Sequence, residues 1–168
     1  TWYVSADGDN LNCGSASSRL ASIQEAIDRA SDLDTVFVSA GTYGENLIIS
    51  GKSLVLIGED SETTIIEPNF QQQGTGVQIQ GVLAASSELN GLTITGANKG
   101  LFIEDTGLGS TVKLENLVIT NNDLIYDGSQ TITGGGVQID DARVDFYNVI
   151  ISDNDIQSYN SHGGGIYI

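Results

Sequence analysis

Short runs of alternating hydrophobic and polar residues cover most of the chain, and one such run occurs three times. Each copy begins with an apolar and a polar residue, continues with Gly or Asn, and ends as an alternating stretch that closes on a hydroxyl residue. The copies are 89–95, 114–120 and 146–152. Period-two alternation of this length predicts β-strands with one buried face. Repetition at irregular intervals predicts stacked coils that are joined by loops of different length.

The third position of each copy predicts a corner in the chain. It is occupied by Gly91, Asn116 and Asn148. Glycine and asparagine enter the left-handed backbone region at the least cost. We therefore expect one strand to end at this position and another to begin after it.

A second pattern consists of a glycine followed by an apolar, a variable and an apolar residue. It occurs at 76–79, 100–103, 136–139 and 165–168. Together the two patterns predict three strands in each coil. For one coil these strands are 101–104, 112–114 and 117–120. Equivalent residues of neighbouring coils would lie about 4.8 Å apart, so the buried side chains would form apolar columns.

The segment 18–30 has a different period. Its apolar residues are three or four positions apart, at Leu20, Ile23, Ile27 and Ala30. This spacing predicts an amphipathic helix. Such a helix would cover the first coil, whose strand edges and apolar cross-section would otherwise be exposed.

These patterns predict an all-β fold: a right-handed, single-stranded parallel β-helix with three sheets and an N-terminal amphipathic capping helix. A chain of 168 residues is long enough for one domain with a sizeable core. We therefore expect a single domain over 1–168. The N-terminal strand and the capping helix would occupy 1–34, and the coils would occupy 35–168.

Several segments resemble the pectin-lyase-like β-helix superfamily. Segments near the start are similar to the opening of its bacterial extracellular members, and segments near the end are similar to the repeats of polymorphic outer-membrane proteins and autotransporter-like passengers. The segments are 2–5, 22–27, 40–43 and 45–49 near the start, and 151–154 and 163–167 near the end. The resemblance implies a secreted or cell-surface protein. It implies no single activity, because this architecture carries lyases, hydrolases, epimerases, adhesins and inert stalks.

Charge narrows the choice of partners. The 22 acidic and 6 basic residues give a formal net charge of −16, which argues against binding of nucleic acid or anionic lipid. The chain has no apolar run of about 18 residues, so we expect no direct membrane insertion. It contains no methionine and begins at Thr1, which favours a processed or excised segment of an exported protein. Cys13 is the single cysteine, and we expect a buried, inert thiol.

Catalytic residues are not predicted, and we expect that the protein is not an enzyme. Galacturonan hydrolases, which the resemblance brings into question, have paired aspartates before an apolar strand and a histidine next to the following one. Here Asp140 and Asp141 follow their strand, and His162 lies three residues before Gly165. The register required for glycoside hydrolysis is therefore missing.

Four carboxylates form a candidate calcium site. If the glycine-led strands are aligned, Glu104 shares an outward column with Asp140, and Asp105 shares one with Asp141. Calcium accepts several oxygen ligands, so this group would suit it. The competing interpretation is that ordinary cations in solution relieve the repulsion between these carboxylates. We expect no other cofactor to be required.

A candidate ligand-binding surface lies on the same strands. Phe102 and Tyr167 alternate there with Gln78 and Gln138, a mixture that would stack on sugar rings and bond to them. The candidate binding residues are Phe102, Gln138 and Tyr167. The competing interpretation is that these side chains only tile the face of a sheet.

The expected function follows from an open last coil. The chain ends at Ile168 within a predicted strand, and no capping segment follows. An unpaired edge of this kind favours self-association, and a head-to-tail contact that does not close gives a filament. We therefore expect an extracellular or cell-surface structural or adhesive module that self-associates end to end or binds a cell-surface partner. The alternative is a protein that binds or processes glycans, with lyase-like or hydrolase-like character.

Overall fold

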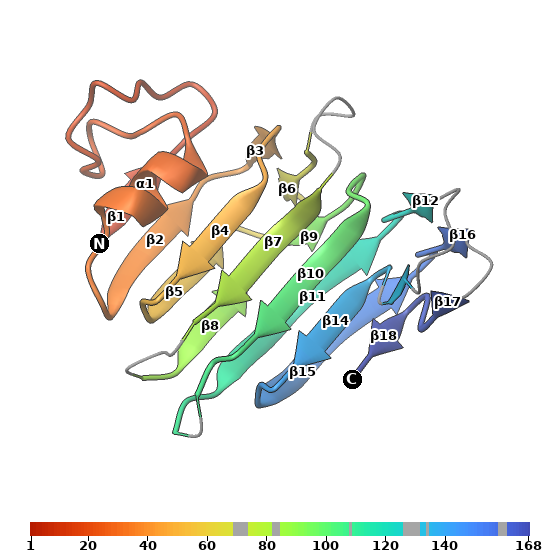
Figure 1. The fold of residues 1–168 in the computed structure, drawn as a ribbon. Coiled ribbons are helices and arrows are strands. Elements are labelled where there is room, and N and C mark those ends of the chain that lie inside the picture. The colour runs from red at the N-terminus through yellow and green to blue at the C-terminus, as the bar shows by residue number, and fades with distance from the viewer. Residues whose placement is uncertain (69–73, 82–84, 108, 126–131, 134, 158–160) are drawn as a thin grey trace.

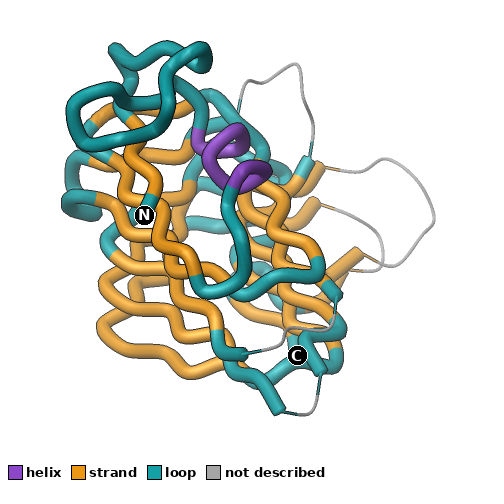
Figure 2. The backbone as a smooth tube through the Cα atoms, turned by 90° about the vertical axis from the view of Figure 1, so that its left-hand side faces the viewer, coloured by secondary structure: helices purple, strands orange, loops and turns teal. Residues whose placement is uncertain are grey.

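The computed structural model describes all residues except 69–73, 82–84, 108, 126–131, 134 and 158–160. Two parallel β-sheets lie one behind the other, and the chain passes back and forth between them (Figure 1). The backbone trace shows the passages stacked as successive layers, with the helix near one end of the stack (Figure 2). A layer is defined here as one strand of the first sheet together with the strands of the second sheet that follow it.

The first sheet has five strands, and each is paired in parallel with the next. They are, in order across the sheet, β4 (Leu47–Ser50), β7 (Thr75–Gln80), β10 (Lys99–Glu104), β14 (Val137–Asp140) and β18 (Ile166–Tyr167). All the glycine-led segments fall within or just before these strands. The register stacks one apolar residue of each strand into a column, namely Leu47, Val77, Leu101, Val137 and Ile166.

The second sheet has nine strands and two arms that meet in β11 (Val112–Thr120) and β15 (Val144–Ser152). The first arm continues through β8 (Ser87–Asn90), β5 (Leu54–Gly58), β2 (Asp34–Val38) and β1 (Trp2–Val4). The second arm continues through β9 (Thr93–Ile94), β6 (Thr64–Ile66) and β3 (Gly41–Tyr43). Two small parallel sheets pair β12 (Leu124–Ile125) with β16 (Ile156–Gln157), and β13 (Ile132–Thr133) with β17 (Ser161–His162).

The predicted three-sheet right-handed parallel β-helix is wrong. The described residues form two main parallel sheets, one of them strongly bent, with two small sheets and one short helix. The corner was predicted at the correct residues, because Gly91, Asn116 and Asn148 have φ values of 67°, 50° and 51°. However, Asn116 lies inside β11, whose first half pairs with β8 and whose second half pairs with β9. One left-handed residue bends the strand without ending it, so the expected second and third sheets are one sheet.

Apolar columns between the sheets form the core. One column in the first arm runs through Leu56, Leu89 and Leu114, and each of these side chains is fully buried. A column in the second arm runs through Ile66, Ile94 and Ile119, which are also fully buried. Because the layers are in register, each apolar side chain is covered by its equivalents above and below.

The helix α1 (Ile23–Arg29) is shorter than the predicted segment 18–30. Leu20 instead forms an isolated parallel bridge with Val4, although its side chain is buried as the pattern predicted. The Glu45 carboxylate accepts hydrogen bonds from the first residues of the helix, including the Ile23 N–H at 2.9 Å. Among the described residues, no helix has the length and apolar character that a membrane span requires.

Side chains from both ends of β4 hold α1 against the first layer. At the other end of the helix from Glu45, Lys52 Nζ donates to the carbonyl oxygens of Ile27 and Ala30 at 3.1 and 3.0 Å. The Gln24 amide covers the outer edge of β4. Its Oε1 accepts from the Ile48 N–H at 2.8 Å, and its Nε2 donates to the Ile48 carbonyl at 3.1 Å. Gln24 thus makes the two bonds that a neighbouring strand would make.

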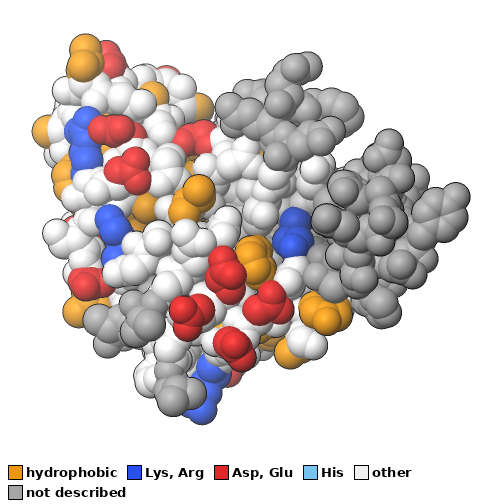
Figure 3. Space-filling model, in the orientation of Figure 1, with side chains coloured by type: hydrophobic (Ala, Val, Ile, Leu, Met, Phe, Trp, Pro, Cys, Tyr) orange, Lys and Arg blue, Asp and Glu red, His pale blue; other side chains and the backbone are white. Residues whose placement is uncertain are grey.

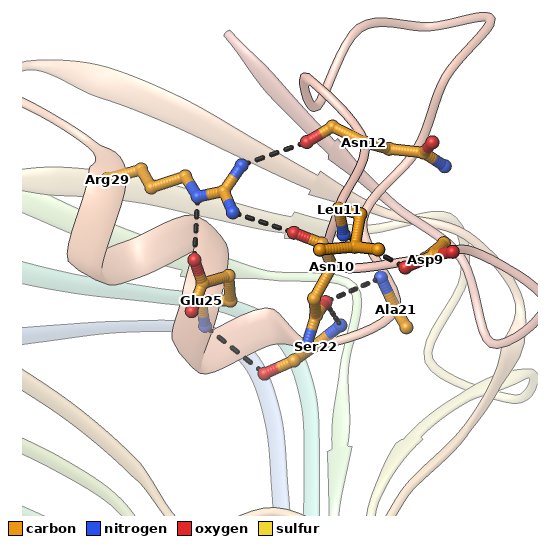
Figure 4. A network of polar contacts seen from close by, with 8 residues as sticks. All are labelled: Asp9, Asn10, Leu11, Asn12, Ala21, Ser22, Glu25 and Arg29. Atoms are coloured by element: carbon orange, nitrogen blue, oxygen red, sulfur yellow. Dashed lines mark hydrogen bonds and ion pairs between the residues drawn. The ribbon is translucent and has the colours of Figure 1, made fainter.

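The loop before α1 completes this end of the molecule (Figure 4). Asn10 Oδ1 accepts from the N–H groups of Ala21 and Ser22, at 3.0 and 2.9 Å. Arg29, which pairs with Glu25 at 2.7 Å, also donates to the Asn10 carbonyl at 2.7 Å. The loop is therefore fixed to the helix at both of the helix's ends.

The loop also hydrogen-bonds to the outer edge of β1. The Tyr3 N–H donates to the Gly14 carbonyl, and the Leu20 N–H donates to the Tyr3 carbonyl, each at 2.9 Å. The outer edges of β1 and β4, the first strands of their sheets, are therefore both hydrogen-bonded, one by backbone and one by a side-chain amide.

The corner can be tested with two substitutions at Asn116. Asn116→Val places a β-branched residue at a positive φ and removes the side-chain bonds to Asn90 and Asn148, which measure 3.1 and 2.8 Å. We expect it to lower the free energy of unfolding by about 3 kcal/mol, because backbone strain and two lost bonds add together. Asn116→Gly removes only the bonds and should lower it by about 1 kcal/mol. Urea denaturation measures both, and equal losses would contradict a strained corner.

Candidate functional site

The outer face of the five-stranded sheet and the turns after β10 and β14 carry the side chains that the sequence marked as candidates for binding. A group of acidic side chains gathers over the ends of β7, β10 and β14, beside hydrophobic ones (Figure 3). This face and the exposed edge formed by β15 and β18 are the two candidate sites within the described residues.

The four predicted calcium ligands follow one another at the ends of β10 and β14. Glu104 and Asp140 are register partners, and the Asp105 N–H donates to the Asp140 carbonyl at 3.1 Å. Asp105 and Asp141 both have a φ of 48°, so the chain turns at the same point in both layers. The register therefore brings the two pairs onto neighbouring strands.

Side-chain amides already bind two of these carboxylates. Gln78 Nε2 donates to Glu104 Oε1 at 3.1 Å, and Gln138 Nε2 donates to Asp140 Oδ2 at 2.5 Å. In the part of the chain that the structure describes, no three His, Cys, Asp or Glu side chains are grouped as a metal site would require. Calcium binding therefore stays a prediction from the sequence, without support from the geometry.

The three predicted ligand-binding residues lie in one column. Gln138 is the register partner of Phe102 on one side and of Tyr167 on the other, and Gln78 precedes Phe102. Aromatic and amide side chains thus alternate across four strands. Phe102 and Tyr167 are each half-buried, whereas Gln138 is buried.

Lys99 occupies the centre of this face, and the sequence did not predict its role. Its Nζ lies 4.7 Å from the centroid of the Phe102 ring and also donates to Gln138 Oε1. Strict alternation would place Lys99 on the inward side with Leu101 and Ile103. Gly100 lies between Lys99 and Leu101, and the long side chain of Lys99 reaches the outer face at this point. No alternation rule would have identified it.

Burial lowers the pKa of the Lys99 ammonium, and the carboxylates of Asp140 and Glu104 act against this effect. The cation also covers one face of the Phe102 ring, as a cation–π contact does. A sugar ring would therefore have to displace Lys99 before stacking on that side of Phe102. The face behaves as a connected polar network rather than as an open aromatic platform.

The residues that were considered for hydrolysis belong to different sheets. Asp140 belongs to β14 in the five-stranded sheet, whereas His162 belongs to β17 in one of the small sheets. Asp141 lines a shallow hollow together with Asp105 and Arg143. The expectation that the chain has no catalytic site stays a prediction.

The prediction of a buried thiol at Cys13 is wrong. Cys13 is exposed, and its Sγ lies 3.5 Å from Ser15 Oγ as a hydrogen-bond donor. Hydrogen bonding to Ser15 lowers the pKa of the thiol. The residue lies in the loop before α1, where the alternating pattern of the sequence does not extend.

The last strand of each main sheet, β15 and β18, differs sharply from the covered strands. Phe146 continues the column of Leu114 but is 38% exposed, whereas Leu114 is fully buried. Ile166 continues the column of Val137 and is 42% exposed, whereas Val137 is fully buried. Within the described residues, β15 pairs with β11 alone and β18 with β14 alone. These two strands form what we call the open edge.

No protein-family model matches the chain, and the search of curated proteins finds no match either. Functional inference therefore depends on the geometry of the two candidate sites.

The electrostatic environment of Lys99 can be tested by NMR titration of its side chain. Removing a nearby negative charge with Glu104→Gln or Asp140→Asn should lower the pKa of Lys99 further, because both carboxylates favour the charged amine. Glu67→Gln is the matched control. Glu67 is an exposed residue directly after β6, and its substitution should leave the pKa of Lys99 unchanged. An unchanged pKa in all three variants would show that Lys99 does not lie beside these carboxylates.

Proposed function

We propose that this protein is a non-enzymatic structural or adhesive module of the extracellular space or the cell surface, and that it assembles through the open edge. The observation that carries the proposal is the exposure of Phe146 in a column whose preceding members Leu114, Leu89 and Leu56 are fully buried. Exposed apolar side chains beside unpaired strand edges favour association with a further β segment. We infer that a segment of this kind covers these side chains.

A column of glycines indicates that a further layer would fit on the same edge. At Gly76, Gly100 and Gly136, an added Cβ would lie 2.5–2.8 Å from the carbonyl oxygen of the next layer, which leaves no room for a side chain. Gly165 continues this column, but an added Cβ there would meet nothing within 4 Å. A layer placed on β18 would give Gly165 the steric role that the other three glycines have.

At the opposite end of the molecule, two of the three edge strands are already hydrogen-bonded on their outer sides, and the third, β3, is only three residues long. A head-to-tail filament needs two complementary open edges. The outer edge of β1 is bonded to Gly14 and Leu20, and the outer edge of β4 is bonded to Gln24. We therefore propose that purified molecules associate in pairs through the open edge rather than as filaments.

The alternative function, glycan binding or processing, has less support. Its best feature is the column of Phe102, Gln138 and Tyr167, but Lys99 covers one face of Phe102 and bonds to Gln138. The net charge of −16 would also repel acidic polysaccharides. Turnover of any glycan in a degradation screen, with or without calcium, would favour this alternative over the structural module.

Sedimentation velocity at increasing protein concentration tests the proposed assembly. We expect the unmodified chain to form dimers, and we expect Phe146→Lys to remain monomeric, because an inward-pointing charge on an open edge blocks pairing. Leu11→Lys is the matched control: Leu11 is 93% exposed in the loop at the opposite end, so dimers should persist.

Ile166→Lys provides a second variant of the open edge, on the other sheet, in case Phe146→Lys weakens the fold. Circular dichroism checks that each variant is folded. A chain that stays monomeric at every concentration, or dimers that respond equally to the Leu11 and Phe146 changes, would overturn the proposal.

A further inference from the structure

An amine and a carboxamide meet on two neighbouring strands of the five-stranded sheet. Lys99 begins β10, and Gln138 lies in β14, 39 positions further along the chain. Lys99 Nζ donates a hydrogen bond to Gln138 Oε1, and the carbonyl carbon Cδ of Gln138 is bonded directly to that oxygen. An amine that is held against an amide carbonyl in this way is positioned to attack the carbonyl carbon.

The surroundings of the amine favour its neutral, reactive form. The Phe102 ring lies 4.7 Å from Lys99 Nζ, and Gln138 is only 8% exposed. None of the ion pairs among the described residues includes Lys99. Burial lowers the pKa of Lys99, so a larger share of its side chain is uncharged than for an exposed lysine. Only the uncharged amine is a nucleophile.

A carboxylate lies at the nitrogen of the same carboxamide. Gln138 Nε2 donates to Asp140 Oδ2 at 2.5 Å, and Asp140 also lies close enough to Lys99 to favour its charged form. Asp140 therefore contacts the nitrogen that would leave and lies near the nitrogen that would attack. A carboxylate in this place can accept a proton from one nitrogen and deliver it to the other.

We propose that Lys99 and Gln138 form an intramolecular amide cross-link between β10 and β14, with release of ammonia. The bond from Lys99 Nζ to Gln138 Cδ forms, and the bond from Cδ to Nε2 breaks. One proton passes from Nζ to Nε2 through the Asp140 carboxylate, which is regenerated. The neutral amine and the carboxamide thus give a secondary amide and ammonia, and no further reactant is needed.

The other lysines and glutamines of this part of the molecule lack the same arrangement. Gln78, the register partner of Phe102 on the other side, directs its amide to Gln80 and Glu104, at 2.7 and 3.1 Å. Lys113 Nζ pairs with carboxylates, which favour its charged form. Gln78 and Lys113 are therefore matched controls for the two linked residues.

The cross-link would hold two layers together without the register that otherwise fixes them. It closes a long loop that includes β11, so it restrains the unfolded chain as a disulfide of the same span does. We expect the linked chain to melt about 10 °C above the unlinked one. This inference does not rest on the proposed function, because the link lies on the outer face of the sheet and not at the open edge.

Intact-mass spectrometry of the purified full chain, incubated at neutral pH, tests for the link. We expect a species that is lighter by one molecule of ammonia. Gln138→Leu and Lys99→Arg should each abolish it, because the first removes the carboxamide and the second removes the amine. Gln78→Leu and Lys113→Arg should form it as the unmodified chain does. A folded, unmodified chain that keeps its full mass throughout the incubation would overturn the proposal.

Tryptic peptides locate the link. The step from Asn90 to Gly91 can also lose ammonia, by closing a succinimide, so the mass alone does not identify Lys99. Trypsin cleaves after lysine and arginine but not after an acylated lysine. The link should therefore join the segments 53–113 and 114–143 in one species. Loss of ammonia that is confined to the peptide with Asn90, or loss of water through Asp140 instead, would overturn the assignment.

The rate of link formation tests the role of Asp140. Asp140→Asn removes the proton carrier and should slow the reaction about a hundredfold. Glu104→Gln removes the other carboxylate near Lys99, which contacts Gln78 rather than Gln138, and should not slow it. Circular dichroism checks that each variant is folded. Equal slowing by the two changes would contradict proton transfer through Asp140.

The link also removes the amine whose pKa the NMR titration of Lys99 measures. We expect the Lys99 amine signal to decay as the lighter species forms and to persist in Gln138→Leu, which is therefore the background for that titration. An amine signal that remains at full intensity in chains that have lost ammonia would show that Lys99 is not linked.

Discussion

The structure depends on the register between parallel layers. Every apolar column, the repeated corner and the Asn116–Asn148 and Asn122–Asn154 pairs require that a residue lie directly beside its equivalent in the next layer. Fully burying one aliphatic side chain contributes about 1.5–3 kcal/mol, whereas an exposed ion pair contributes about 0–1 kcal/mol. The columns through Leu114 and Ile119 therefore fix the layers, and the surface pair of Lys113 with Glu88, at 3.6 Å, contributes little. A shift by one residue would turn each column to the outer face.

The bent sheet shows how much of this fold the sequence can predict. The repeats identified the buried positions and the residues of the corner, because burial and left-handed backbone both restrict which residue types are allowed. They could not show whether the sheet continues through the corner. That depends on the hydrogen bonds on both sides of Asn116, which bond the same strand to β8 and to β9. A residue type reports its own backbone conformation and not the pairing of its neighbours.

The helix and Lys99 show a second limit of prediction from the sequence. Leu20 and Ile23 fit one helical period, but Leu20 is used in a bridge with Val4, and both uses bury the side chain equally well. Lys99 lies where alternation assigns an inward position, and its long aliphatic stem lets the amine reach Phe102. The predicted binding residues were therefore placed in the correct columns, while the cation that organises them was missed. Flexible side chains escape rules that are based on strand period alone.

The two ends of the stack use the same chemistry with different results. At the first layer, the Gln24 amide accepts from and donates to Ile48, as a peptide group would. At the last layers, asparagine amides do the same between neighbouring chain segments. The difference lies in the element that carries the amide. Gln24 belongs to a helix whose buried face, with Ile23 and Ile27, covers the apolar columns and so ends the stack. Asn148 belongs to a strand that leaves Phe146 exposed. An amide on a strand that leaves core side chains exposed allows a further layer to be added. An amide on a helix with an apolar face ends the stack, because that face covers the core.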